Sequence, residues 1–163
     1  MRAKYLSMFA ALLLVSACQS ASDNNTGAVS GGGTTATTAQ NTGPVPGSKE
    51  DFVVNVGDRV FFGFDRYDLT PEATATLDRQ AAWLKQYPAV TVTIEGHADE
   101  RGTREYNLAL GERRATAVKN YLVAVGVDAG RVQTISFGKE RPEVLGSNEA
   151  AWAQNRRGVT VVN

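Results

Sequence analysis

From residue 59 to the end of the chain, stretches of alternating apolar and polar residues are separated by stretches with helical spacing. The apolar segment 59–64 predicts a first strand, and the alternation in 90–95 predicts a half-buried second strand. Two further strands are expected at 132–137 and 159–162. The pattern therefore predicts four strands.

Three segments between these strands are expected to be helical. Thr70 is a good N-cap for the first helix, and Pro88 ends it. The second helix is expected at 104–125, where a broad apolar face runs up to the stop signal Gly126. A short third helix is expected at 148–157.

The order βαβαβ(α)β predicts an α/β (α+β) fold, with one mixed four-stranded sheet packed on helices. Strands joined through a helix favour parallel pairing, while the last strand can run antiparallel. We place this single domain at residues 49–163.

The beginning of the chain has the pattern of a lipoprotein signal. Two basic residues precede an uncharged run at 5–17, which is shorter than the roughly 20 residues of a spanning helix. The segment Val-Ser-Ala-Cys at 15–18 resembles a bacterial lipobox, in which the cysteine becomes the acylated first residue. We therefore predict a signal peptide at 1–17 and lipidation of Cys18.

Residues 18–48 are predicted to form a flexible linker behind the lipidated cysteine. The segment is rich in Gly, Thr, Ser and Asn and contains no aromatic residue, so it cannot bury enough apolar surface to offset ordering. In lipoproteins of this type Asp after the cysteine often retains the protein in the inner membrane, and this chain has Gln19. The expected location is the outer membrane, lipid-anchored, with the domain facing the periplasm.

Composition excludes several kinds of chemistry. The chain has 17 basic and 17 acidic residues, so broad neutralisation of nucleic-acid phosphates is not expected. One His and one Cys leave few ligands for a metal site and few partners for a nucleophilic triad. We expect no metal, no cofactor and no catalytic residue.

The best candidate for a site is the loop 96–103, between the second strand and the second helix. Ligands in open α/β sheets bind outside the carboxyl ends of strands, and the loop after the first strand ends at the same edge if the two strands run parallel. Asp99 and Arg114 could then face one cavity. Spacing alone leaves other roles open, because Asp99 could cap the helix or pair with Arg101, and Arg114 could be a solvated helix charge.

Four ordered motifs carry a resemblance to a known family. They are Phe-Gly-Phe-Asp at 62–65, Gly-His-Ala-Asp-Glu-Arg-Gly-Thr at 96–103, Tyr-Asn-x-x-Leu-Gly-Glu-Arg-Arg-Ala at 106–115, and Asn-Arg-Arg at 155–157. With these motifs, the stretch 91–157 resembles an OmpA-like peptidoglycan-binding domain. The whole chain is similar to the lipoproteins of the Tol-Pal system.

The resemblance implies non-covalent binding of peptidoglycan through the diaminopimelate residue of its stem peptide, without cleavage. Asp99 would accept the side-chain ammonium of that residue, and Arg114 would take its carboxylate. The residues that would complete the pocket are Phe64, Asp65, Arg101 and Leu110. Because Asp99 and Arg114 would bind the ligand, we expect Asp99→Ala and Arg114→Ala to leave the thermal midpoint of the domain nearly unchanged.

The resemblance also implies a role in the cell envelope. The protein would tether the outer membrane to the cell wall, with TolB and other Tol system proteins as partners in envelope integrity and in constriction during division. Two rival functions are a metal-assisted hydrolase acting on peptidoglycan and the wall-binding half of a motor stator.

We expect five other residues to have structural roles. His97 is expected to make a loop hydrogen bond, because a lone histidine gives a thin metal site. At least one of Arg156 and Arg157 should pair within the domain, since consecutive side chains point apart. Trp83 and Trp152 are expected to pack rather than to stack on a sugar.

Overall fold

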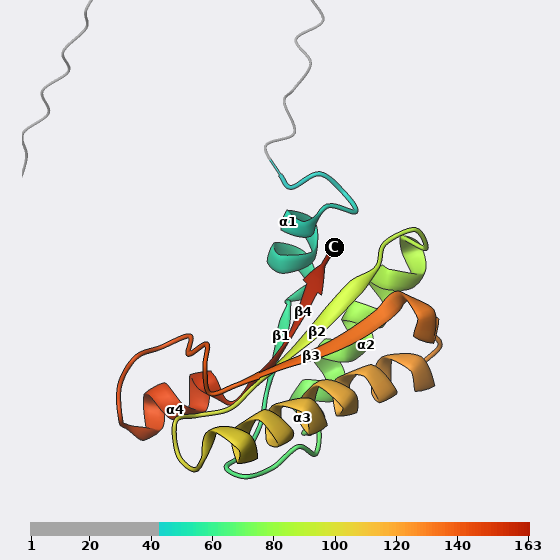
Figure 1. Cartoon of the computed structure of the whole chain (residues 1–163). Coiled ribbons are helices and arrows are strands. Elements are labelled where there is room, and N and C mark those ends of the chain that lie inside the picture. Colours follow the sequence, from blue (N-terminus) through green and yellow to red (C-terminus); the bar gives the residue numbers. More distant parts are fainter. Residues whose placement is uncertain (1–42) are drawn as a thin grey trace, which may run out of the picture. The chain divides into compact units, whose positions relative to one another are not determined.

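A four-stranded sheet organises residues 43–163, the part of the chain that the computed structural model describes. The predicted signal peptide, Cys18 and most of the predicted linker lie outside these residues. The strands are β1 (Arg59–Phe61), β2 (Val92–His97), β3 (Val132–Gly138) and β4 (Arg157–Val162), and their order in the sheet is β1-β4-β2-β3 (Figure 1).

The sheet is mixed, as predicted. β4 lies between β1 and β2 and runs antiparallel to both, whereas β2 and β3 are parallel. β1 and β2 therefore point the same way. Their carboxyl ends, and the loops that follow them, meet at one edge of the sheet.

Four α-helices accompany the strands in the described part of the chain. They are α1 (Lys49–Asp51), α2 (Pro71–Gln86), α3 (Arg104–Ala124) and α4 (Glu149–Asn155), with a π-helical turn at Phe52–Val56 and a 3₁₀ turn at Ala129–Arg131. Thr70 and Thr103 cap α2 and α3 by accepting a backbone N–H three residues on. Among residues 43–163, no helix is long and apolar enough to cross a membrane.

Helices α2 and α3 pack against each other and against the sheet (Figure 1). The core between them includes Leu77 and Leu84 of α2, Ile94 of β2, and Val118 and Leu122 of α3, all fully buried. Alternate residues of each strand face this layer, because side chains of a strand point to opposite sides in turn.

Two differences from the sequence-based prediction concern the start of the domain. Helix α1 and the π-helical turn were not expected, yet they place Phe52 in the core. Asp51 accepts a hydrogen bond from Trp83 Nε1 at 2.8 Å. A segment this short has too few turns to show helical periodicity, so its structure depends on contacts with α2.

The first strand is also shorter than predicted, ending at Phe61 instead of residue 64. After Phe62 the backbone turns away from the sheet, and Asp65 adopts a left-handed conformation with φ of 56°. The carbonyls of Gly63 and Arg66 accept hydrogen bonds from Arg114 rather than from a neighbouring strand. This early turn brings the loop over α3.

Candidate functional site

A pocket of about 160 Å³ lies where the loops after β1 and β2 meet the first turns of α3. All six residues that the sequence analysis assigned to binding line it. The lining residues are Phe64, Asp65, Asp99, Arg101, Gly102, Tyr106, Asn107, Leu110 and Arg114. The structure therefore brings together side chains from three separate segments.

Arg114 forms the innermost charge of the pocket. Its side chain is fully buried, and three of its N–H groups donate to backbone carbonyls: Nε to Arg66 at 2.8 Å, Nη1 to His97 at 2.8 Å, and Nη2 to Gly63 at 3.0 Å. Burial lowers the pKa of Arg114 to about 10, which leaves it charged at neutral pH. Since a guanidinium has five N–H groups, each terminal nitrogen keeps one for another acceptor.

Asp99 is buried between two arginines. Its Oδ1 accepts the backbone N–H and the Nε–H of Arg101, each at 3.1 Å, and its Oδ2 accepts Nη2 of Arg101 at 2.6 Å. Nη1 of Arg156 lies 3.5 Å from Oδ2. Burial favours the neutral acid, but the bonds from Arg101 and the charge of Arg156 outweigh it and lower the pKa of Asp99. The carboxylate is therefore ionised at neutral pH.

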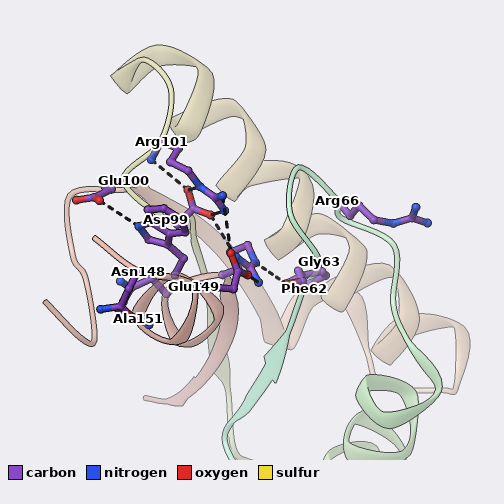
Figure 2. A network of polar contacts seen from close by, with 12 residues as sticks. Phe62, Gly63, Arg66, Asp99, Glu100, Arg101, Asn148, Glu149 and Ala151 are labelled. Atoms are coloured by element: carbon purple, nitrogen blue, oxygen red, sulfur yellow. Dashed lines mark hydrogen bonds and ion pairs between the residues drawn. The ribbon is translucent and has the colours of Figure 1, made fainter. Parts of the chain in front are cut away.

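Arg101 is held in place from several directions. Its guanidinium carbon lies 4.1 Å from the centre of the Phe64 ring and 4.0 Å from the centre of the Trp152 ring. Figure 2 shows its side chain turned back toward Asp99, with Glu149 nearby. Trp152 donates its Nε1–H to Glu100 at 3.0 Å. The loop after β1, the loop after β2 and α4 thus meet at one cation.

Asp65 supplies a second carboxylate on the exposed side of the pocket. Tyr106 of α3 donates its hydroxyl hydrogen to Asp65 Oδ1. The neighbouring carboxylate raises the pKa of Tyr106, because it stabilises the protonated phenol. This bond ties the loop after β1 to the first turn of α3 and leaves the other oxygen of Asp65 available.

The pocket therefore contains fixed charges of both signs. Asp65 and Asp99 are anions, and Arg101 and Arg114 are cations. Leu110 and the exposed ring of Phe64 supply apolar wall between them. Such a cavity is chemically suited to a short-chain ligand that carries an ammonium and a carboxylate on an apolar stem.

Three pocket residues were not assigned by the sequence analysis: Gly102, Tyr106 and Asn107. Helical spacing could have identified two of them. Tyr106 and Asn107 precede Leu110 by four and three positions, which places them on the face of α3 that carries the predicted ligand residues. Asn107 donates to the carbonyl of Arg101 at 2.8 Å and so fixes the loop.

Several expectations about single residues are tested by the contacts. The alternative that Arg114 is a solvated helix charge is wrong, because its side chain is fully buried. The expected loop hydrogen bond of His97 is also wrong, since neither ring nitrogen makes a hydrogen bond within residues 43–163, and Nε2 only approaches Glu95 Oε2 at 3.5 Å. The expected internal pairing is confirmed: Arg156 pairs with Asp99 and Glu149. In the same residues no three His, Cys, Asp or Glu side chains are grouped as metal ligands.

Comparison with known families identifies the class to which this fold and pocket belong. Residues 61–156 match the model of the OmpA family, and the chain belongs to that family. The match begins at the last residue of β1 and ends just before β4, so it includes the pocket segments, α3 and α4.

Its curated relatives include proteins named peptidoglycan-associated lipoprotein. The one from Rhizobium meliloti is 60% identical over 117 residues, which is 72% of this chain and 66% of that protein. The one from Brucella melitensis is 56% identical over 118 residues, 72% of this chain and 70% of that protein. The chain thus matches about two thirds of the length of these relatives.

Solved structures show the same fold. The peptidoglycan-associated lipoprotein from Burkholderia pseudomallei aligns with a TM-score of 0.64 at 45% identity, over 65% of this chain and 90% of that one. The C-terminal domain of Helicobacter pylori MotB aligns with a TM-score of 0.61 over 65% of this chain and 84% of that one. At 18% identity, the second likeness shows the fold alone.

Proposed function

We propose that this domain binds peptidoglycan non-covalently through the diaminopimelate residue of the stem peptide. The observation that carries the proposal is the pocket itself, in which two carboxylates and two guanidiniums converge within about 160 Å³. The free end of the diaminopimelate side chain carries one ammonium and one carboxylate on an apolar stem. The names of the curated relatives support the same ligand class.

The contacts of the charged side chains support one arrangement of the bound ligand. The ligand ammonium lies between Asp99 and Asp65, whose carboxylates enter the pocket from the two loops. Its carboxylate accepts the two remaining terminal N–H groups of Arg114, one from each nitrogen. Phe64 and Leu110 contact the methylene stem.

The proposal is binding without cleavage. The charged groups of the pocket are held by hydrogen bonds and ion pairs. In the proposed arrangement they contact the opposite charges of the ligand. For the alternative function of a metal-assisted hydrolase, the described residues contain no group of three His, Cys, Asp or Glu side chains that could hold a metal ion. The similarity to MotB does not support the alternative function of a motor stator, because a sequence identity of 18% shows only that the fold is shared.

At the scale of the cell, we propose that the domain tethers the outer membrane to the cell wall. Lipidation of Cys18 would supply the membrane end, and the linker to residue 48 would supply the reach. The similarity to lipoproteins of the Tol-Pal system makes TolB and other Tol system proteins the proposed partners.

The ligand proposal is tested with two synthetic stem peptides. One contains diaminopimelate, and the other contains lysine, which lacks the side-chain carboxylate. We expect the diaminopimelate peptide to bind at least about tenfold more tightly, because the lysine peptide leaves the Arg114 charge without its partner. Equal affinity in calorimetric titrations would contradict the assignment.

A protein variant provides an independent test. Asp99→Asn should lose most binding to isolated sacculi, while the control Asp128→Asn, a carboxylate in the turn before β3, should bind as the parent does. Incubation of the parent protein with sacculi should release no soluble fragments. Release of fragments would instead support the hydrolase.

A further inference from the structure

A second hollow, of about 380 Å³, runs along α3 beside the loop after β1. Its lining includes Tyr67 from that loop and Arg113, Thr116, Ala117 and Asn120 from the helix. We call it the α3 groove. Neither the resemblance nor the pocket contacts assign it a role.

The α3 groove continues the pocket along the same helix. Tyr106, Leu110, Arg113 and Ala117 are spaced by four, three and four residues, so they lie on one face of α3. The first two line the pocket and the last two line the groove. With a rise of 1.5 Å per residue, the groove lining on α3, from Glu112 to Asn120, extends about 12 Å along the helix axis and begins about 3 Å beyond Leu110.

Arg113 gives the groove a positive charge. Its guanidinium lies 5.9 Å from the centre of the exposed Tyr67 ring, and it makes no ion pair among residues 43–163. The other charged residue of the lining, Glu112, directs its carboxylate to Thr116 and Thr134, at 3.4 and 3.3 Å. Both bonds come from neutral hydroxyls to Oε1 alone, so the groove lining holds one carboxylate and one guanidinium, and Arg113 is the cation that an acidic ligand group would meet.

On the side of the pocket opposite the α3 groove, Arg101 forms the wall. The rings of Phe64 and Trp152 pack against its guanidinium. Two carboxylates contact this wall: Glu100 accepts the Nε1–H of Trp152 at 3.0 Å, and Glu149 Oε2 lies 3.9 Å from Nη1 of Arg101. An acidic group leaving the pocket on that side would meet carboxylates, whereas along α3 it would meet a cation.

We infer that the α3 groove binds the acidic residue that precedes diaminopimelate in the stem peptide. This inference rests on the proposed function, which anchors diaminopimelate in the pocket. The preceding glutamate is linked through its γ-carboxyl group, so its α-carboxylate is free. An extended diaminopimelate side chain and one further residue span roughly 10 Å, enough to pass from the pocket beside Leu110 into the groove.

In this arrangement Arg113 binds the free α-carboxylate, and the ring of Tyr67 covers the backbone of the peptide. An amide at that position removes the charge without changing the size of the group. The groove therefore distinguishes stem peptides that carry glutamate from those that carry its amide.

The test uses two diaminopimelate tripeptides, one with the free α-carboxylate and one with the α-amide. Amidation should weaken binding to the parent protein about two- to fivefold, the range of an exposed ion pair. In Arg113→Gln the two peptides should bind equally. Arg104→Gln, which removes an exposed arginine of the same helix outside the groove, should keep the preference of the parent.

The outcomes separate the two proposals. If the parent protein binds neither tripeptide, both the pocket assignment and the groove assignment fail. If it binds both with equal affinity, only the groove assignment fails. A preference for the free carboxylate that persists in Arg113→Gln would place the recognising cation elsewhere and would also overturn the groove assignment.

Discussion

The guanidinium of Arg101 and the indole of Trp152 lie in contact, with the cation 4.0 Å from the ring centre. This contact joins α4 to the loop after β2. Arg101 in turn holds both oxygens of Asp99. Trp152 therefore helps to position Asp99, the carboxylate proposed to bind the ligand ammonium, although it does not line the pocket.

Trp152→Leu should weaken binding of the diaminopimelate tripeptide about two- to fivefold, because a cation–π contact of a partly exposed arginine is lost. Trp152→Phe keeps an aromatic ring but loses the bond to Glu100, and it should retain most of the affinity. Titration calorimetry of both variants measures the difference. Unchanged affinity in Trp152→Leu would show that Arg101 is held without the indole.

Arg114→Ala should destabilise the domain as well as abolish binding. The sequence analysis predicted little change in stability, but the buried contacts of Arg114 lead us to expect a large one. Three backbone carbonyls, two in the loop after β1 and one at the end of β2, would lose a charged donor. We expect a loss of at least about 3 kcal/mol in the free energy of unfolding, measured by urea denaturation. A loss below about 1 kcal/mol would mean that water replaces the guanidinium at little cost.

His97 should make stability depend on pH in the mildly acidic range. Burial, followed by the charges of Arg157 and Arg141, lowers the pKa of His97 from 6.5 to about 4. Between these values the unfolded chain binds a proton that the folded chain does not, so stability is full above pH 6.5 and falls as the pH drops. The expected loss between pH 7 and pH 5 is about 2 kcal/mol.

His97→Phe provides the control, because the ring packs beside Phe137 and the chain has no other histidine. Urea denaturation at pH 7 and pH 5 should show a smaller loss in this variant. The same loss in both proteins would assign the effect to the carboxylates instead.

Gly96→Ala should prevent close packing of β2 on α3. A β-carbon at Gly96 would overlap the carbonyl oxygen of Gly111, and backbone cannot move aside as a side chain can. We expect a loss of about 3 kcal/mol or more in the free energy of unfolding, or failure to fold. Gly130→Ala, where the β-carbon would meet only the Asp128 side chain at 3.1 Å, should have a much smaller effect. Comparable thermal midpoints for the two variants would argue against this packing constraint.

Much of the local structure could be predicted because it depends on neighbouring residues. Thr70 and Thr103 precede α2 and α3, and Gly126 follows α3 with a φ of 99°. The helix predicted at 104–125 is observed as Arg104–Ala124. Caps and periodicity operate over one or two turns, so they can be recognised without knowledge of the rest of the chain.

The pocket could be predicted only in part. The parallel direction of β1 and β2 explains why Asp65 and Asp99 share an edge, and the family motifs indicated which residues to expect there. The sequence analysis did not anticipate that Arg156 pairs with Asp99 or that Trp152 packs on Arg101. Both residues come from the end of the chain, and no local spacing relates them to the loop after β2.

By itself, the sequence determined the order of the elements, the mixed α/β class and the segments that carry the charged residues, because these follow from periodicity, capping and motif composition. Only the tertiary structure decided what each charge contacts. Arg114 is a buried donor to three backbone carbonyls because the loop after β1 and the end of β2 converge on α3. Contacts between distant segments depend on how the whole core packs, and the pattern of any one segment does not record them.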